Sequence, residues 1–278
     1  MTPASTSTPI PALALERITC TFAARRAKGA AAGHYTAVRD ASLAISTGEF
    51  VSVVGPTGCG KTTLLNVAAG LLSPSAGSVQ VRGVPLAGIN AHAGYMFQAD
   101  ALMPWRSALS NVAAGLEFRD VAGTEAAPRA REWLARVGLA GFEDRFPHQL
   151  SGGMRRRVAL AQMLILDPQI LLMDEPFSAL DIQTRLLMEN ELLDLWSADR
   201  KSVLFITHDL EEAISLSDRV IVLSAGPETR PIGEFAIDLP RPRDVAEIRM
   251  TPRFVELHSA IWQPLKSEVL KGYAQSRR

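Results

Sequence analysis

The sequence predicts an α/β fold, in which a core built on a parallel β-sheet is preceded by an antiparallel β layer and interrupted by an inserted α-helical subdomain. The first observation is a glycine-rich stretch at 55–60, between a short apolar run and a helical pattern. The second is the alternation of apolar and polar segments over 13–45, which is typical of antiparallel strands. The third is the helical spacing of apolar residues over 108–140.

These patterns divide the chain into segments. Residues 1–12 are expected to form a disordered leader, and residues 13–225 the main domain. The helical subdomain is expected at about 99–165, between the halves of the sheet. Beyond Gly226 the composition changes to proline and arginine, and the chain ends in an amphipathic helical pattern, so residues 226–278 are expected to form a small C-terminal appendage.

Composition excludes several classes of protein. Lysine plus arginine equals aspartate plus glutamate, at 29 each, which argues against a general nucleic-acid coat, and we expect no nucleic-acid partner. The two cysteines form neither a disulfide framework nor a zinc pattern. The N-terminus lacks the pattern of a secretory signal, and charged or polar residues interrupt the most apolar window, so no membrane span is predicted.

The stretch GPTGCGKTT at 55–63 matches the phosphate-loop pattern, in which glycines allow a tight turn whose backbone N–H groups point at phosphate oxygens. The preceding run Phe50–Val54 predicts a buried strand, and Lys61–Leu72 predicts a helix whose start favours an anion. A glycine-rich turn without a ligand is the alternative. The residues predicted to contact phosphate groups are Gly55, Pro56, Thr57, Gly58, Cys59, Gly60, Lys61, Thr62 and Thr63. Cys59 lies near Lys61 and a helix start, which predicts a lowered pKa for its thiol; the alternative is a small residue that merely fits the loop.

Polar residues end several of the predicted strands. Gln98 follows one strand, Asp174 and Glu175 follow the apolar run at 170–173, and His208 follows the run ending at Thr207. In open α/β sheets, ligands bind at the carboxyl ends of the strands. Beside a phosphate loop, the two carboxylates predict a nucleotide triphosphatase, in which one holds Mg²⁺ and the other orients and deprotonates water. On their own, such a carboxylate pair would more often form a turn, and a lone histidine would more often be structural.

A second candidate anion site lies further along the chain. Ser151, Gly152 and Gly153 precede a strongly helical segment, so free backbone N–H groups are expected at a helix start. Three arginines at 155–157 follow, and we expect at least two of them on a solvated helix face, since consecutive helical residues point in different directions.

Two aromatic side chains have open alternatives. Phe22 could stack on a nucleotide base or lie in the core. Trp105, which follows Pro104, could be an exposed anchor for another protein or be buried within the chain.

Five motifs in one order make the chain resemble the ATP-binding subunit of an ABC transporter: GPTGCGKTT, the strand ending at Gln98, LSGGM, ILLMDEP with SALD, and His208. The resemblance covers about residues 13–265 and implies a P-loop NTPase core of the RecA-like type, with residues 13–225 as the ABC ATPase domain. FQADALMPW, PHQLSGGMRRRV and IDLPRPRD resemble the nitrate, sulfonate and taurine import branch.

The resemblance implies a role for each matching residue. Lys61 would hold the β and γ phosphates of ATP, Glu175 would be the general base for water, and His208 would contact the γ phosphate. Mg²⁺ would be held by Thr62, Gln98 and Asp174, and Thr63 would lie near the α phosphate. A second copy of the chain would contribute the signature residues to each site, with Asp181 at the junction; these residues are Ser151, Gly152, Gly153 and Met154.

The resemblance also implies partners and a location. A homodimer of the chain would lie peripherally on the cytoplasmic face of the inner membrane. There it would energise integral-membrane permease subunits for uptake of a small anionic or sulfur-containing solute, with a solute-binding protein as an indirect partner. A soluble ABC-type ATPase in DNA repair or translation is the alternative, although such proteins usually carry two cassettes or a long coiled coil. A phosphate-loop kinase would leave LSGGM and His208 without a purpose.

The chain departs from the family pattern at three places. Met154 and Arg156 stand where the family often has glutamine. The insert Ala23–His34 changes the strand register, so Tyr35 is the alternative to Phe22 as the base-stacking residue.

Overall fold

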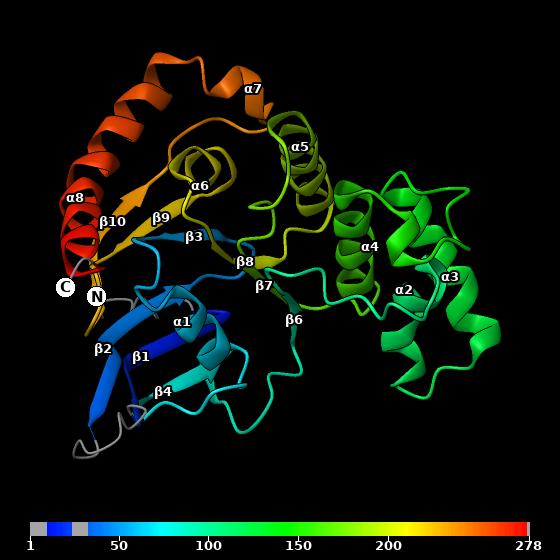
Figure 1. The fold of residues 1–278 in the computed structure, drawn as a ribbon, viewed down its shortest axis with the longest axis horizontal. Helices are drawn as coiled ribbons and strands as arrows, with labels where there is room; N and C mark the ends of the chain where they lie inside the picture. The colour runs from blue at the N-terminus through cyan, green and yellow to red at the C-terminus, as the bar shows by residue number, and fades with distance from the viewer. Residues whose placement is uncertain (1–9, 24–32, 277–278) are drawn as a thin grey trace, which may run out of the picture.

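Two β-sheets carry the fold in the computed structural model, which describes residues 10–23 and 33–276 (Figure 1). An antiparallel sheet has the strand order β2-β1-β4-β5, and a larger sheet has the order β10-β9-β3-β8-β7-β6. The strands are β1 (Leu13–Ala23), β2 (His34–Ile45), β3 (Phe50–Val54), β4 (Ala76–Val81), β5 (Val84–Pro85), β6 (Ala93–Met96), β7 (Ile170–Asp174), β8 (Ser202–Ile206), β9 (Arg219–Leu223) and β10 (Pro231–Ala236). The antiparallel layer expected over 13–45 is confirmed by the pairing of β1 with β2.

Helices cover the faces of the larger sheet and form the subdomain beside it. They are α1 (Lys61–Ala68), α2 (Ala108–Glu117), α3 (Gly123–Arg136), α4 (Gly152–Leu164), α5 (Ile182–Asp199), α6 (Leu210–Leu216), α7 (Val245–Ile248) and α8 (Pro252–Ser276), with a 3-10 turn η1 (Pro147–Gln149). Within the described ranges, none of these helices is long and apolar enough to cross a membrane.

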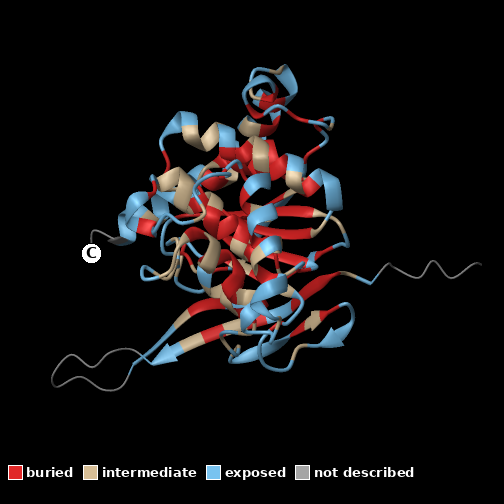
Figure 2. Ribbon diagram, turned by 90° about the vertical axis from the view of Figure 1, so that its right-hand side faces the viewer, coloured by how far each residue is buried: buried red, intermediate tan, exposed pale blue. Residues whose placement is uncertain are grey.

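The larger sheet is parallel from β9 to β6, and it is buried on both faces. Alternate residues of its strands enter two hydrophobic cores, because side chains of a strand point to opposite faces in turn. Leu172 and Leu204 pack towards α1 and the antiparallel sheet, whereas Leu171 and Phe205 pack towards α4 and α5. Figure 2 shows the buried residues gathered along these central strands.

The helical subdomain has a hydrophobic core of its own. Residues of α2, α3 and α4 share it, including Val112, Leu134 and Val158, which are fully buried. The subdomain lies at the right-hand end of the molecule in Figure 1, beyond β6. Because α4 belongs to this subdomain, its N-cap Ser151 lies beside the central sheet and not at a strand end.

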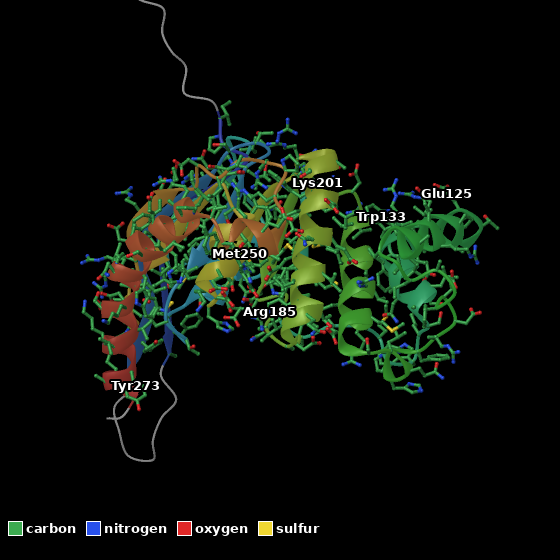
Figure 3. All side chains as sticks on the ribbon, turned by 90° about the horizontal axis from the view of Figure 1, so that it is seen from above. Glu125, Trp133, Arg185, Lys201, Met250 and Tyr273 are labelled. Atoms are coloured by element: carbon green, nitrogen blue, oxygen red, sulfur yellow. The ribbon has the colours of Figure 1, made fainter. Side chains whose placement is uncertain are left out.

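The C-terminal segment packs on the same domain. Strand β10 pairs antiparallel with β9, and α8 buries Ile261 and Leu265 in a core that also contains Val54 and Val220. Helix α8 lies at the end of the molecule opposite α3 (Figures 1 and 3). The domain boundary near residue 225 stays a prediction. Most of the expected leader and of the insert, residues 1–9 and 24–32, lie outside the described residues.

Candidate functional site

The glycine-rich loop connects the end of β3 to the start of α1, as the motif requires. Gly58 and Gly60 have φ values of 74° and 107°, in the left-handed region that favours glycine. A Cβ atom on Gly60 would lie 3.1 Å from Cγ2 of Val38, so this position also has little room for a side chain. The loop therefore depends on its glycines for both its conformation and its close contact with β2.

Lys61 holds its charged group against the loop. Its Nζ donates hydrogen bonds to the carbonyl oxygens of Gly55 at 2.9 Å and Pro56 at 3.1 Å. The same Nζ lies 3.9 Å from Oε1 of Glu175, and the side chain is only 5% exposed. A buried ammonium at a helix start provides a strong attraction for an anion.

Asp174 ends β7 beside the first turn of α1. Its Oδ1 accepts a hydrogen bond from Oγ1 of Thr62 at 3.2 Å. Burial raises the pKa of Asp174, although the Thr62 hydrogen bond and the charge of Lys61 oppose this effect. A positive charge placed at this carboxylate would favour its ionised form, and hydroxyl and carboxylate oxygens are ligands that Mg²⁺ prefers.

Glu175 contacts two other predicted site residues, His208 and Gln98. Its Oε2 lies 2.9 Å from Nδ1 of His208 and accepts a hydrogen bond from Nε2 of Gln98 at 3.3 Å. The Glu175 backbone has a φ of 43°, uncommon for a residue with a side chain, and its N–H donates to the carbonyl of Ile206 at 2.8 Å. The strained backbone and the hydrogen bond to β8 hold this carboxylate at the edge of the sheet.

These side chains surround a cavity of about 440 Å³. Its volume lies within the range of sites for small molecules. It is lined by Thr57, Gly58, Gly60, Lys61, Thr62, Thr63, Gln98, Glu175 and His208, all of which the sequence predicted. Loop N–H groups, a lysine, a carboxylate and a histidine thus converge on one space that suits a polyphosphate.

The predicted signature residues and Asp181 do not line this cavity. Ser151 caps α4 by accepting a hydrogen bond from the N–H of Met154 at 3.2 Å. Asp181 caps α5 in the same way, with Thr184 as the donor at 3.0 Å. The two caps are neighbours, since a Cβ atom on Gly153 would lie 2.7 Å from Cγ2 of Thr184.

The two candidate base-stacking residues face each other. Phe22 on β1 is the register partner of Tyr35 on β2, and both are partly exposed, at 39% and 44%. Residues directly opposite in an antiparallel pair share a face of the sheet. Neither lines the cavity, so their part in binding a base stays a prediction.

The structure corrects the expectation for Cys59. The thiol is 2% exposed, and burial raises its pKa, outweighing the opposing charge of Lys61. A Cβ atom on Gly55 would lie 3.0 Å from its Sγ, so the thiol packs beneath the loop. The sequence argument counted the nearby positive charge and omitted the burial.

The sequence did not identify Arg156 as a contributor to the site. Its guanidinium is 2% exposed and donates hydrogen bonds to the carbonyls of Phe97, at 2.9 Å, and Gln98. Arg155 and Arg157 are partly exposed, and each pairs with a carboxylate. The sequence of three adjacent arginines does not indicate which of them is buried.

Trp105 is exposed, at 72%, which favours the first of its two alternatives. Trp105 lies in the loop between Gln98 and α2, and Leu102 in the same loop is partly buried. The exposed indole is therefore available to another molecule.

Comparison with known proteins agrees with this site. The family model described as ABC transporter matches residues 38–178, about half of the chain. This range contains the glycine-rich loop, the signature residues and the two carboxylates.

Curated relatives and solved structures extend the match. An uncharacterised ABC transporter ATP-binding protein of Methanocaldococcus jannaschii is 48% identical and covers 85% of this chain and 86% of its own. The taurine import ATP-binding protein TauB of Burkholderia pseudomallei is 43% identical over 92% of this chain and 97% of its own. A dimeric ATP-binding cassette in a post-hydrolysis state, bound to ADP and phosphate, aligns with a TM-score of 0.71 and 32% identity, covering 82% of this chain and 100% of its own. The chain belongs to the ABC transporter family, as one of its ATP-binding ATPase subunits.

Proposed function

We propose that this chain hydrolyses ATP to drive a separate membrane permease that imports taurine or a related sulfonate. The name of the Burkholderia relative supports this solute class, as does a second TauB, from Yersinia pestis, that is 49% identical over 69% of this chain. Nitrate and other small anions are the alternative solutes, because the ATPase need not contact the solute.

The observation that carries the proposed chemistry is the position of Glu175. Its carboxylate faces the cavity between Gln98 and His208, 3.9 Å from the ammonium of Lys61. With the γ phosphate of ATP bound at Lys61 and the loop N–H groups, a water molecule between phosphate and carboxylate would be placed for attack. Glu175 would accept the proton of that water as the water oxygen bonds to the γ phosphorus and the bond to the β–γ bridging oxygen breaks, so that ADP leaves; His208 would contact the γ phosphate.

The donor atoms near the cavity fit a magnesium ion held jointly by protein and nucleotide. Thr62, Asp174 and Gln98 would supply the protein oxygens. When bound, the ion would neutralise charge on the phosphates.

A head-to-tail homodimer explains the separation of the two anion sites. Ser151, Gly152 and Gly153 start α4 outside the cavity of their own chain, and Ser151 is exposed. In the dimer, they would bind the γ phosphate held by the partner, with Asp181 at the junction. The dimeric state named for the aligned cassette supports the formation of a dimer.

The proposed permease contact lies beside the loop that follows Gln98. A groove of about 250 Å³ there includes the aromatic side chains of Phe97 and Phe118, which are 46% and 75% exposed. With Trp105, they offer apolar anchors for a helix of the permease. The chain would then bind peripherally on the cytoplasmic face, and a solute-binding protein would act on the opposite side.

Replacing Glu175 with Gln tests the proposed chemistry. The variant should bind ATP and dimerise while hydrolysis falls by at least a hundredfold, because the general base is lost. Near-normal turnover would contradict the role given to Glu175. A matched control is Glu234→Gln, an exposed carboxylate on β10 that should leave turnover unchanged.

Reconstitution tests the solute. Vesicles that contain the chain, its permease and the binding protein should accumulate radiolabelled taurine when ATP is supplied, and the Glu175→Gln variant should not support accumulation. Accumulation of nitrate without taurine would reassign the solute and keep the ATPase role.

A further inference from the structure

Helix α8 places a buried carboxylate next to the strand that supports the phosphate loop. Glu268 is 6% exposed, and its Oε2 accepts a hydrogen bond from the backbone N–H of Ala225 at 2.8 Å. Its Oε1 pairs with Nζ of Lys271 at 2.5 Å. A buried carboxylate needs such partners, and one of the two is a backbone group just past the end of β9.

The segment that Glu268 holds lies directly beneath the phosphate loop. Gly226 follows Ala225, and a Cβ atom on Gly226 would lie 3.6 Å from Cα of Cys59 and 3.6 Å from the carbonyl oxygen of Gly58. A side chain at Gly226 would therefore touch the loop, so the segment after β9 passes close beneath the loop backbone. Any shift of Ala225 would be passed to the turn whose N–H groups bind phosphate.

Helix α8 also passes close to the loop from its other side, where Pro56 and Gly272 line one cavity. Gly272 lies one helical turn after Glu268, and a Cβ atom there would be 3.4 Å from Cβ of Pro56. Trp262 and Val269 of α8, with Pro56 and Thr57, surround a cavity of about 550 Å³ between the helix and the loop. Because this space is not filled by side chains, α8 approaches the loop on this side mainly at Gly272.

We propose that α8 positions the phosphate loop, with Glu268 and Gly272 as the positioning residues, so that affinity for the nucleotide phosphates depends on where this helix lies. The proposal rests on the proposed function, since it concerns the same nucleotide site. Glu268 acts through Ala225, and Gly272 acts directly on Pro56. Binding of an anion by backbone N–H groups depends on their alignment, so a small displacement weakens it.

Two matched pairs of variants test this role, with the dissociation constant of a non-hydrolysable ATP analogue as the readout. Glu268→Ala removes the acceptor for Ala225 and should weaken binding by about tenfold, because the loop N–H groups are then held less well in the alignment that binds phosphate. Glu268→Gln keeps an oxygen that accepts this bond and should bind within about twofold of the parent. Glu256→Ala, an exposed carboxylate on the same helix, should bind as the parent does.

The Gly272 pair separates positioning from stability. Gly272→Leu should press on Pro56 and weaken binding by about tenfold, while its helix propensity maintains or raises the urea midpoint of unfolding. Gly272→Ala makes an ordinary contact and should bind as the parent does. Parent-like affinity in both Glu268→Ala and Gly272→Leu would overturn the proposal, as would equal weakening by Glu268→Ala and Glu268→Gln. If the parent itself failed to bind the analogue, the proposed function would fail instead.

Discussion

The guanidinium of Arg156 on α4 donates a hydrogen bond to the backbone carbonyl of Gln98 at the end of the sheet. It also donates to the carbonyl of Phe97 at 2.9 Å and lies 3.5 Å from Oδ1 of Asp100. Burial lowers the pKa of Arg156, but an arginine remains charged in a protein. The helix that begins at Ser151 and the strand end that carries Gln98 are therefore linked by a buried cation, so a movement of one should displace the other.

We expect Arg156→Met to lower both stability and turnover. Methionine fills much of the space but loses the hydrogen bonds to the carbonyls of Phe97 and Gln98, and loss of a hydrogen bond to a charged group should cost about 1.5–3 kcal/mol in the free energy of unfolding. If Arg156 positions Gln98, kcat should fall more than KM rises, and Arg156→Lys should restore part of it. Urea unfolding and steady-state ATPase assays measure the two effects.

An exposed arginine supplies the control for this experiment. Arg136 is 53% exposed, pairs with Glu132 on α3 and lies over the ring of Trp133, so Arg136→Met should change stability by less than about 1 kcal/mol. Loss of stability in Arg156→Met with unchanged kcat would show that the residue is structural alone.

The sequence predicted the cavity well because the motifs that build it are local. A glycine-rich loop between a strand and a helix dictates its own geometry, and strands of a parallel sheet deliver their following residues to one edge. Lys61, Gln98, Glu175 and His208 accordingly line one cavity. The antiparallel layer was predictable for a similar reason, since its alternation is a property of neighbouring residues.

The contributions of Arg156 and Glu268 could not be predicted in the same way. Each is buried through a contact with a segment far away in the sequence, the loop after β6 for Arg156 and the end of β9 for Glu268. Polar residues in a helical pattern indicate a solvated face, and only tertiary packing overrides that interpretation. Cys59 shows the same limit, because its burial depends on the packing beneath the loop.

Thiol reagents should react slowly with the folded protein. Cys59 and Cys20 are both 2% exposed, and burial raises the pKa of each thiol, so little reactive thiolate is accessible at neutral pH. We expect iodoacetamide to label the native chain at least tenfold more slowly than the chain unfolded in urea. Mass spectrometry of labelled peptides measures both rates. Rapid labelling of native Cys59 that ATP prevents would support an exposed thiolate instead.

The carboxyl of Glu212 should make stability depend on pH. Burial raises its pKa to about 7, with a further increase from Asp209, while a hydrogen bond from Thr207 opposes the shift. Between the ordinary value of 4.5 and about 7, the folded state binds more protons than the unfolded state. The stability that Glu212 contributes is therefore fully present below pH 4.5 and has been lost once the pH has risen past about 7. The total loss in the free energy of unfolding is about 3 kcal/mol.

Glu212→Gln removes this titration and provides the test. Relative to the parent, the variant should gain about 3 kcal/mol in free energy of unfolding between pH 4.5 and pH 8, measured by urea unfolding at several pH values. Glu211→Gln on the same helix replaces a carboxylate that is 54% exposed, and it should follow the parent at every pH. Parallel curves for Glu212→Gln and the parent would show that the carboxyl does not titrate in this range.

A mixing experiment tests whether each ATP site is shared between two chains. Lys61→Ala should inactivate the phosphate loop, and Ser151→Arg should block the exposed helix start that would face the partner's nucleotide, so each variant alone should be inactive.

In a mixed head-to-tail dimer, one site contains both changes and the other contains neither. If each site works independently, random mixing should restore roughly a quarter of the parental ATPase activity, because half of the dimers are mixed and each has one intact site. Sites confined to one chain would remain inactive after mixing. The contrasting pair Lys61→Ala and Glu175→Gln should show no recovery in either arrangement, since both residues line the cavity of the same chain and every mixed dimer then carries one lesion in each site.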